Sequence, residues 1–239
     1  MRDEQVARPR KGRAEKLGQV CTAITAATGE EMARKATAAF ALGTDIVEFR
    51  VDHAGEPPPR VAKGIARFRE KAIFTVRRKE EGGRFAGTEE ERLEVISELA
   101  GLGPLYLDIE LSTANENPGW FAALPDGPRK IVSWHDFRTT PPSAILERKR
   151  DAAGVLGDVA KVVTTSRSEQ DNLRVLKLYE EDPASLIAFC MGERGTVSRI
   201  EAFRLGSPVV YASLPGEPVA AGQLSVETVA GMKRLWEAE

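Results

Sequence analysis

A lysine stands in the middle of an apolar, β-branched run, VAKVVTT, at residues 159–165. Such a run is typical of a strand buried on both faces, so Lys161 must lose much of its solvation there. Burial disfavours the charged ammonium, and a neutral amine is a nucleophile toward a carbonyl carbon. The position therefore predicts a lysine that forms a Schiff base. The alternative is a lysine whose ammonium extends to water at the mouth of the sheet.

A histidine and several arginines could complete the chemistry that such an amine begins. His135 lies in SWHDF, two residues after Ser133, at the end of the preceding apolar run. Imidazole titrates near neutral pH, so His135 could carry protons for a reaction at the neighbouring lysine. Arg50 and Arg77 lie at the ends of strand-like runs, and an arginine binds a carboxylate through two parallel hydrogen bonds. Together these residues predict a substrate with a carbonyl to attack and a carboxylate to hold.

Acidic residues occur at alternate positions in two further runs, which places each pair on one face of a strand. Glu48 lies two residues before Arg50, and these two could form a structural ion pair or contact a substrate. Asp108 and Glu110 could either hold the lower layers of a core through hydrogen bonds or contact a substrate. Residues 78–80, Arg-Lys-Glu, are expected to be an exposed run of charges.

Eight short apolar runs must position these side chains. They lie at residues 18–24, 45–51, 72–77, 104–111, 130–137, 159–165, 186–192 and 208–213. Segments with helical periodicity separate them, and Thr28, Thr88 and Ser168 stand where helix N-caps are expected. Strand and helix alternating eight times predict parallel pairing, and so a single (β/α)8 TIM barrel of the α/β class. A doubly wound open sheet is the alternative, but no glycine-rich fingerprint follows the first run.

Length and charge place further bounds on the molecule. The 239 residues suit one barrel of about 250 residues, so residues 17–239 are expected to form the catalytic domain behind a basic arm at 1–16. The net charge of −2 gives no reason to expect nucleic acid or an anionic membrane as a partner. No apolar run reaches the roughly 20 residues of a membrane span. Cys21 and Cys190 lie in apolar runs, which favours free thiols in a reducing cytoplasm.

The motifs in this order resemble type I 3-dehydroquinate dehydratase, a class I Schiff-base barrel family. The motifs are EFRVD at 48–52, FTVR at 74–77, EGG at 81–83, SWHDF at 133–137, Lys161, MGERGTVSR at 191–199 and AGQ at 221–223. The resemblance implies dehydration of 3-dehydroquinate to 3-dehydroshikimate in the shikimate pathway, which leads to aromatic amino acids. It also implies a cytoplasmic lyase that needs no metal or organic cofactor, with a homodimer as a possible assembly.

The resemblance assigns roles to residues at matching positions. Lys161 matches the lysine that forms the imine, His135 the histidine that transfers protons, and Glu81 the acid that partners this histidine. The residues that match substrate contacts are Glu48, Arg50 and Arg77 for the hydroxyls and ring, Arg199 for the carboxylate, and Gln223 for a lid. The lid departs from the family pattern, because Val219 and Ala221 replace the usual hydroxyl residue and proline.

Two other functions compete with this one. Another class I barrel, such as a phosphosugar aldolase or transaldolase, would need a phosphate site after the seventh and eighth strands. The glycines in GERGTVSR and LPGE could supply its backbone amides, although Arg199 suits a carboxylate equally well. A non-catalytic barrel that binds a carboxylate ligand is the third possibility, and the retained Lys161, His135 and Glu81 argue against it.

Overall fold

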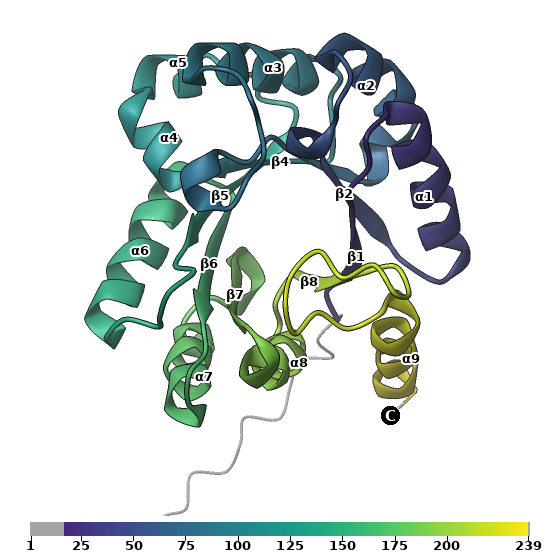
Figure 1. Cartoon of the computed structure of the whole chain (residues 1–239). Coiled ribbons are helices and arrows are strands. Elements are labelled where there is room, and N and C mark those ends of the chain that lie inside the picture. The colour runs from purple at the N-terminus through teal and green to yellow at the C-terminus, as the bar shows by residue number, and fades with distance from the viewer. Residues whose placement is uncertain (1–16, 239) are drawn as a thin grey trace, which may run out of the picture.

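Eight parallel strands surround a central core, and helices cover their outer side (Figure 1). This computed structural model describes residues 17–238, so the predicted arm at 1–16 and Glu239 lie outside the described residues. The strands are β1 Gln19–Ile24, β2 Ile46–Arg50, β3 Ala72–Thr75, β4 Tyr106–Glu110, β5 Arg129–His135, β6 Val159–Thr165, β7 Leu186–Met191 and β8 Val209–Ala212. All eight fall within the predicted apolar runs or one residue beyond them, which confirms the barrel and its strands.

The sheet order runs β7-β6-β5-β4-β3-β2-β1-β8, and every neighbouring pair is parallel. Within residues 17–238, no ladder of hydrogen bonds joins β7 to β8, so the ring of strands is nearly closed. Aromatic packing bridges these two strands, because the rings of Phe189 and Tyr211 lie 6.1 Å apart. This seam lies on the far side of β7 from β6, the strand that carries Lys161.

The α-helices are α1 Gly29–Ala41, α2 Pro58–Ile65, α3 Glu89–Gly101, α4 Leu111–Glu116, α5 Pro118–Ala122, α6 Ser143–Leu156, α7 Glu169–Leu176, α8 Thr196–Arg204 and α9 Val226–Glu237. Short 3-10 helices occur at η1 Val51–His53, η2 Ala66–Lys71, η3 Lys79–Glu81, η4 Lys177–Glu180, η5 Pro183–Ser185 and η6 Glu193–Gly195. The expected caps are confirmed at Thr28, which accepts from the Glu31 amide, and at Thr88, which forms a capping box with Glu91. At α7 the Ser168 amide donates to Asp171, the reciprocal half of such a box.

Strand register separates an apolar end of the barrel from a polar end. Early inward residues such as Ile46, Ile73 and Ile131 form a buried apolar layer. Later positions are polar, and the pairing of β5 with β6 sets Ser133 beside Lys161. The polar groups therefore gather toward the C-terminal ends of the strands, where barrel chemistry occurs.

Candidate active site

One pocket at the C-terminal ends of the strands is lined by all eight residues nominated from the sequence. They are Glu48, Arg50, Arg77, Glu81, His135, Lys161, Arg199 and Gln223. The pocket encloses about 120 Å³, and apolar or aromatic side chains, among them Phe137, Phe189, Met191, Tyr211 and Val219, complete its wall. The eight nominated residues therefore meet at one place from β2, β5, β6, α8 and the two connections that follow β3 and β8.

Lys161 is held by two hydrogen bonds at the base of this pocket. Its Nζ donates to Oδ2 of Asp108 at 2.7 Å and to the hydroxyl of Tyr211 at 3.0 Å, and Oε1 of Glu48 lies 3.9 Å away. The residue is only 5% exposed, which rules out an ammonium that extends into water. Asp108 forms a buried salt bridge with this nitrogen. To attack a carbonyl from this salt bridge, the nitrogen must pass protons on.

Asp108 is the counter-ion of both Lys161 and Arg77. Arg77 donates to Oδ1 of Asp108 at 2.7 Å, and the Ser133 hydroxyl donates to the same oxygen at 2.7 Å. Burial alone would raise the pKa of Asp108, but the charges of Arg77 and Lys161 hold this pKa well below its usual range. Asp108 therefore remains a carboxylate opposite Nζ, and it would pair equally well with a cationic imine at the same atom.

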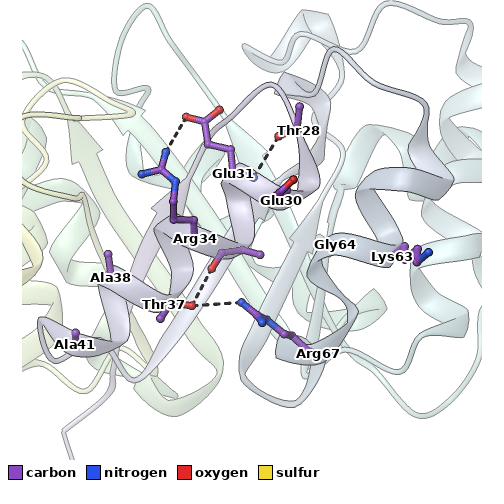
Figure 2. Close-up of a pocket in the computed structure, with 11 residues that line it drawn as sticks. Thr28, Glu30, Glu31, Arg34, Thr37, Ala38, Ala41, Lys63, Gly64 and Arg67 are labelled. Carbon is purple, nitrogen blue, oxygen red and sulfur yellow. Dashed lines mark hydrogen bonds and ion pairs between the residues drawn. The ribbon is translucent and has the colours of Figure 1, made fainter.

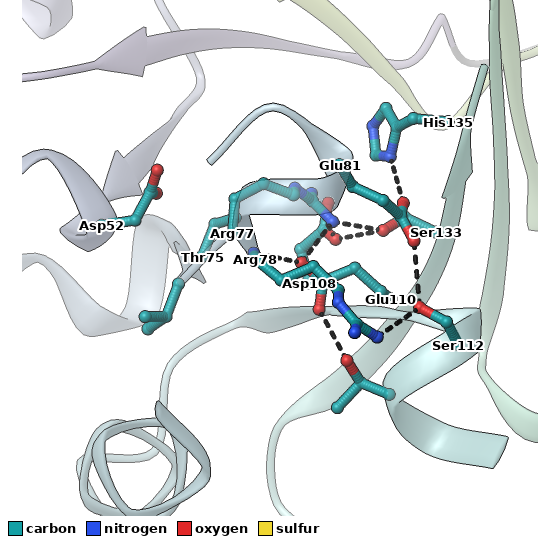
Figure 3. Close-up of polar contacts among 12 residues, drawn as sticks. Asp52, Thr75, Arg77, Arg78, Glu81, Asp108, Glu110, Ser112, Ser133 and His135 are labelled. Atoms are coloured by element: carbon teal, nitrogen blue, oxygen red, sulfur yellow. Dashed lines mark hydrogen bonds and ion pairs between the residues drawn. The ribbon is translucent and has the colours of Figure 1, made fainter. Parts of the chain in front are cut away.

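His135 and Glu81 form the second chemical unit of the pocket. Nδ1 of His135 lies 3.0 Å from Oε2 of Glu81, and Ser112 donates to the other Glu81 oxygen at 3.1 Å (Figure 3). Burial, together with the charges of Arg77 and Lys161, lowers the pKa of His135 well below 6.5. Burial also raises the pKa of Glu81. A neutral imidazole that donates through Nδ1 keeps a lone pair on Nε2, so His135 is prepared to act as a base.

A tight turn after β3 brings Glu81 to the histidine. Gly82 closes η3 with a φ of 76°, a backbone conformation that favours glycine. A Cβ on Gly83 would lie 1.8 Å from the carbonyl oxygen of Arg77, so this position also requires glycine. Arg78 braces the turn by donating to Ser112 at 3.0 Å. The EGG motif is therefore needed to place the carboxylate of Glu81.

The expected run of exposed charges at residues 78–80 is wrong in part. Lys79 and Glu80 are exposed, but Arg78 is half-buried and donates to Glu116 at 3.1 Å as well as to Ser112. Both partners belong to α4, more than 30 residues further along the chain, so local charge pattern could not indicate them. Arg78 ties the loop that carries Glu81 to the next helix.

The paired acidic residues have separate partners. Arg50 binds Asp52 through two hydrogen bonds of 2.9 and 2.8 Å, so the structural ion pair considered between Glu48 and Arg50 is not the one that forms. Glu48 accepts from the Thr75 hydroxyl at 2.8 Å. Both Glu48 and Arg50 still face the pocket, as their alternate positions on β2 predicted.

Arg77 is buried, and its hydrogen bonds go to neighbouring side chains of the protein, although it also lines the pocket. It is 3% exposed, and it donates to Asp108, Glu110 and Ser133 (Figure 3). Glu110 also accepts from Arg92 at 3.0 Å. Asp108 and Glu110 therefore hold a buried polar network together, which is the hydrogen-bonding role that the sequence left open for them.

Arg199 has no such partner among residues 17–238. The side chain is 4% exposed, and among the described residues its Nε and Nη2 atoms are buried without any hydrogen bond. Its guanidinium lies over the Phe189 ring, 4.2 Å from the ring centre. Burial lowers the pKa of Arg199 to about 10, so the group is still a cation near pH 7. An uncompensated buried cation that lines a pocket is suited to an anionic ligand.

The loop between β8 and α9 covers the pocket and is organised by Gln223. Its side-chain oxygen accepts from the amides of Val219 at 3.0 Å and Ala220 at 3.3 Å, and its Nε2 donates to the Ala212 carbonyl at 2.8 Å. The Gly192 amide after β7 donates to the Ala221 carbonyl at 3.1 Å. Gln223 thus keeps this loop folded over the site, and most of its hydrogen-bonding capacity is used within the loop.

A larger hollow lies outside the barrel, between α1 and α2 (Figure 2). It encloses about 1000 Å³, but its charged groups are solvated: Arg34 contacts Glu31 at 3.6 Å and is 75% exposed, and Arg67 donates weakly to Thr37 at 3.5 Å. No buried, unpaired polar atom of residues 17–238 faces this hollow. The inner pocket is therefore the candidate active site despite its smaller volume.

Sequence reasoning missed Tyr211, which contacts the central amine. The run PVVYAS carries no charge, and a tyrosine within it has the pattern of a core residue. The available signal was its parity with Val209 on β8, which turns both side chains toward the barrel interior. Phe189 was missed for the same reason, although it packs against Arg199.

Comparison with known proteins agrees with this arrangement. The sequence profile of the Type I 3-dehydroquinase family matches residues 20–237. A 3-dehydroquinate dehydratase of Methanopyrus kandleri is 34% identical over 212 residues, which cover 87% of this chain and 95% of that protein. One from Thermococcus gammatolerans is 39% identical over 199 residues, 82% of this chain and 90% of the relative. The crystal structure of 3-dehydroquinate dehydratase from Geobacillus kaustophilus HTA426 has the same fold, with a TM-score of 0.81, 24% identity and 92% of each chain covered. The chain belongs to the type I 3-dehydroquinase family.

Proposed function

We propose that this protein dehydrates 3-dehydroquinate to 3-dehydroshikimate through an imine on Lys161. One observation carries the proposal beyond family membership: the same pocket is lined by a buried lysine, a neutral histidine and an arginine that has no hydrogen-bond partner at Nε or Nη2 within residues 17–238. The lysine can form an imine with a ketone, the histidine can remove a proton from an acidic C–H bond, and the arginine can bind a carboxylate. A cyclic keto acid with a leaving hydroxyl group requires these three functions together.

The reaction needs a strong electron sink next to the bond that breaks. Removing a proton beside a ketone leaves a carbanion that the neutral carbonyl stabilises only modestly. A cationic imine on Lys161 takes up that electron pair better, and the carboxylate of Asp108 stands 2.7 Å from the nitrogen to balance the charge. His135 removes the proton, and as an acid it then assists departure of the hydroxyl as water. Hydrolysis of the product imine restores the lysine.

The remaining pocket residues bind the substrate or support its binding. We assign Arg199 to the carboxylate, and Glu48 and Arg50 to the ring hydroxyls. Arg77 acts on the substrate chiefly through Asp108 and Ser133, because its hydrogen bonds are directed to them and to Glu110. Gln223 acts by holding the covering loop in place. No added metal or organic group is required by these steps.

The direct test is to mix the purified protein with 3-dehydroquinate and follow the ultraviolet absorbance of the conjugated product. Turnover, together with a borohydride-trapped adduct on Lys161, would support the proposal. A protein that traps a sugar phosphate on Lys161 but leaves 3-dehydroquinate unchanged would be an aldolase-like barrel instead. A protein that binds 3-dehydroquinate without turnover would be a non-catalytic carboxylate-binding barrel.

Arg199→Ala is expected to raise KM about ten- to a hundredfold with a smaller effect on kcat. The carboxylate contact exists in both ground and transition states, so its loss weakens both. A charge-assisted pair of this kind contributes about 1.5 to 3 kcal/mol. Arg199→Lys should recover only part of the affinity, because an ammonium cannot make the two-pronged contact. Steady-state kinetics measure these changes.

A matched control for Arg199 is Arg204→Ala on the same helix, since Arg204 is exposed and packs over Trp236. Its KM should equal that of the wild type. Arg199→Met keeps volume over the Phe189 ring, and it should raise KM as much as the alanine variant while thermal stability is retained. A wild-type KM for Arg199→Ala would move the carboxylate site to Arg50 or Arg77.

We also propose that the enzyme works in the cytoplasm and as a homodimer. Among residues 17–238 no helix is long and apolar enough to cross a membrane. The buried free thiols of Cys21 and Cys190 support a reducing compartment. Leu173 on α7 and Val197 on α8 are 59% and 50% exposed, which offers apolar surface to a second copy. Light scattering of the purified protein would show the assembly, and a monomeric mass would contradict the dimer.

A further inference from the structure

The resting lysine holds the protons that imine formation must move. Nζ forms a 2.7 Å salt bridge with the Asp108 carboxylate, and the ammonium is the form of the lysine that such a bridge holds. The balance is then R–NH3⁺ plus a ketone giving R–NH⁺=C plus water. Two protons leave the nitrogen, and both end on the former carbonyl oxygen, which departs as water. A direct transfer would pass through a strained four-membered ring, so a group beside Nζ should relay these protons.

Three side chains approach Nζ, and two of them are poorly suited to this relay. Asp108 is fully engaged with Arg77, Ser133 and Lys161, and its pKa is held well below the usual range, so it accepts a proton only reluctantly. Glu48 lies 3.9 Å away, beyond hydrogen-bonding distance, and accepts from Thr75. A carboxylate that stays ionised can steady the cation, but it has no proton to pass on.

His135 is directed elsewhere. Its Nδ1 is bound to Glu81, and within the described chain it makes no hydrogen bond to Nζ. On β5 it stands beside Val163, two residues beyond Lys161 on the neighbouring strand β6. This position suits a base that acts on the substrate carbon next to the imine.

Tyr211 has the required geometry. Its hydroxyl oxygen accepts a hydrogen bond from Nζ at 3.0 Å, and Nζ lies 4.3 Å from the centre of its ring. The phenol is 6% exposed, its ring packs against Phe189, and it lines the pocket. Among residues 17–238 nothing accepts the hydrogen of this hydroxyl, so the O–H is free to donate to a substrate oxygen. A hydroxyl can accept and donate in one step, as a relay requires.

We propose that Tyr211 is a further catalytic residue, the proton relay between Lys161 and the carbonyl oxygen of the substrate. As the nitrogen lone pair forms the C–N bond, the phenol oxygen takes a proton from Nζ and its own proton moves to the carbonyl oxygen. A second pass delivers the remaining proton, the C–O bond breaks, and water leaves with the cationic imine in place. The phenol is unchanged after each pass, and hydrolysis of the product imine runs the same sequence in reverse.

The surroundings of Tyr211 support a relay that never builds up phenolate. Burial, and the nearby charge of Glu48, raise the pKa of Tyr211 well above 10. The resting group is therefore the neutral phenol, which both gives and takes a proton in a concerted transfer. The two residues then have separate roles: Tyr211 moves protons between the nitrogen and the carbonyl oxygen, while His135 takes the proton from carbon and gives one to the departing hydroxyl.

The inference rests on the proposed function, and Tyr211→Phe tests it, because this change removes the hydroxyl and keeps the ring between Phe189 and Lys161. Enzyme and 3-dehydroquinate are mixed, quenched with borohydride at successive times, and weighed by intact-mass spectrometry. We expect imine formation to slow about 100-fold, the lower part of the range for acid–base groups, with little change in KM. The matched control is Tyr106→Phe, whose hydroxyl binds Arg129 at the other end of the barrel. This variant should form the imine at the wild-type rate.

A second measurement uses the unaltered enzyme, so it does not depend on how the variant folds. Rates of imine formation in mixtures of light and heavy water should curve with deuterium content, because two protons move in each relay pass. A linear dependence, or wild-type trapping kinetics in folded Tyr211→Phe, would overturn the relay while leaving the proposed function intact. A wild-type protein that forms no adduct with 3-dehydroquinate would overturn both.

Discussion

Lys161→Ala is expected to lower kcat/KM for 3-dehydroquinate by at least about 10⁴-fold, because loss of a covalent nucleophile removes the path as well as a contact. Among the described residues no other lysine lines the pocket, so no second amine can replace it. Borohydride with substrate should add a stable mass to the wild type, on the peptide that contains Lys161. The variant should show none.

The control variants separate chemistry from folding. Lys161→Arg keeps a cation beside Asp108 but cannot form an imine, so it should be as inactive as the alanine variant and fold at least as well. Lys79→Ala removes an exposed lysine from the loop before Glu81, and it should retain full activity and the full adduct. An adduct that persisted in Lys161→Ala, on any other lysine, would sink the assignment.

The local sequence pattern was sufficient to predict the positions of the strands and to place the active site at their C-terminal ends. Each strand is a short apolar run, and parallel strands all end on the same side of a barrel. A lysine within such a run conflicts with its surroundings, and conflicts of this kind mark functional sites. The eight nominated residues therefore meet in one pocket, although six of them were nominated only through resemblance or position at a strand end.

Contacts across the barrel could not be read in the same way. Tyr211 on β8 contacts Lys161 on β6 because the ring of strands brings β8 next to β7, only two strands from β6. The sequence shows eight repeated units but not that the last unit lies near the sixth. Within residues 17–238, Nε and Nη2 of Arg199 have no hydrogen-bond partner. This depends on all the residues that surround the guanidinium in space, so a short sequence motif cannot indicate it. Arg50 forms its ion pair with Asp52 and not with Glu48. Asp52 lies in η1, the 3-10 helix that begins directly after Arg50.

The charge environment of Lys161 and His135 also depends on contacts between strands that the sequence does not show. The sequence indicated correctly that Lys161 is buried, but it did not indicate that Asp108 would be fixed opposite by Arg77 and Ser133. That network gives Nζ a carboxylate partner at 2.7 Å, and the proposed relay through Tyr211 starts from this salt bridge. The network also supplies the positive charge that keeps His135 neutral.

His135→Ala is expected to fail in a different manner from Lys161→Ala. Proton removal from carbon should slow by about 10² to 10⁴, the usual contribution of a general acid–base group. The amine, Asp108 and Tyr211 remain, so borohydride should still trap an adduct on Lys161, and this adduct should contain substrate that has not yet lost water. Mass spectrometry distinguishes the two adducts by the mass of one water molecule. Near-normal kcat without His135 would place the base elsewhere.

The pH dependence of the wild type gives an independent check on the same residue. The active base is the neutral imidazole, whose pKa is lowered well below 6.5 by burial and by the charges of Arg77 and Lys161. A base with a depressed pKa is neutral above that pKa and is lost only as the pH falls through it. kcat/KM should therefore keep its full value as the pH falls through 6.5 and should decline well below that point. Glu81→Gln keeps the shape of the partner but removes its charge at Nδ1, so it should lower kcat while Lys161 still forms its adduct. An acid limb centred at or above 6.5 in the wild type would show that His135 is not the neutral base that its burial and its charged neighbours require.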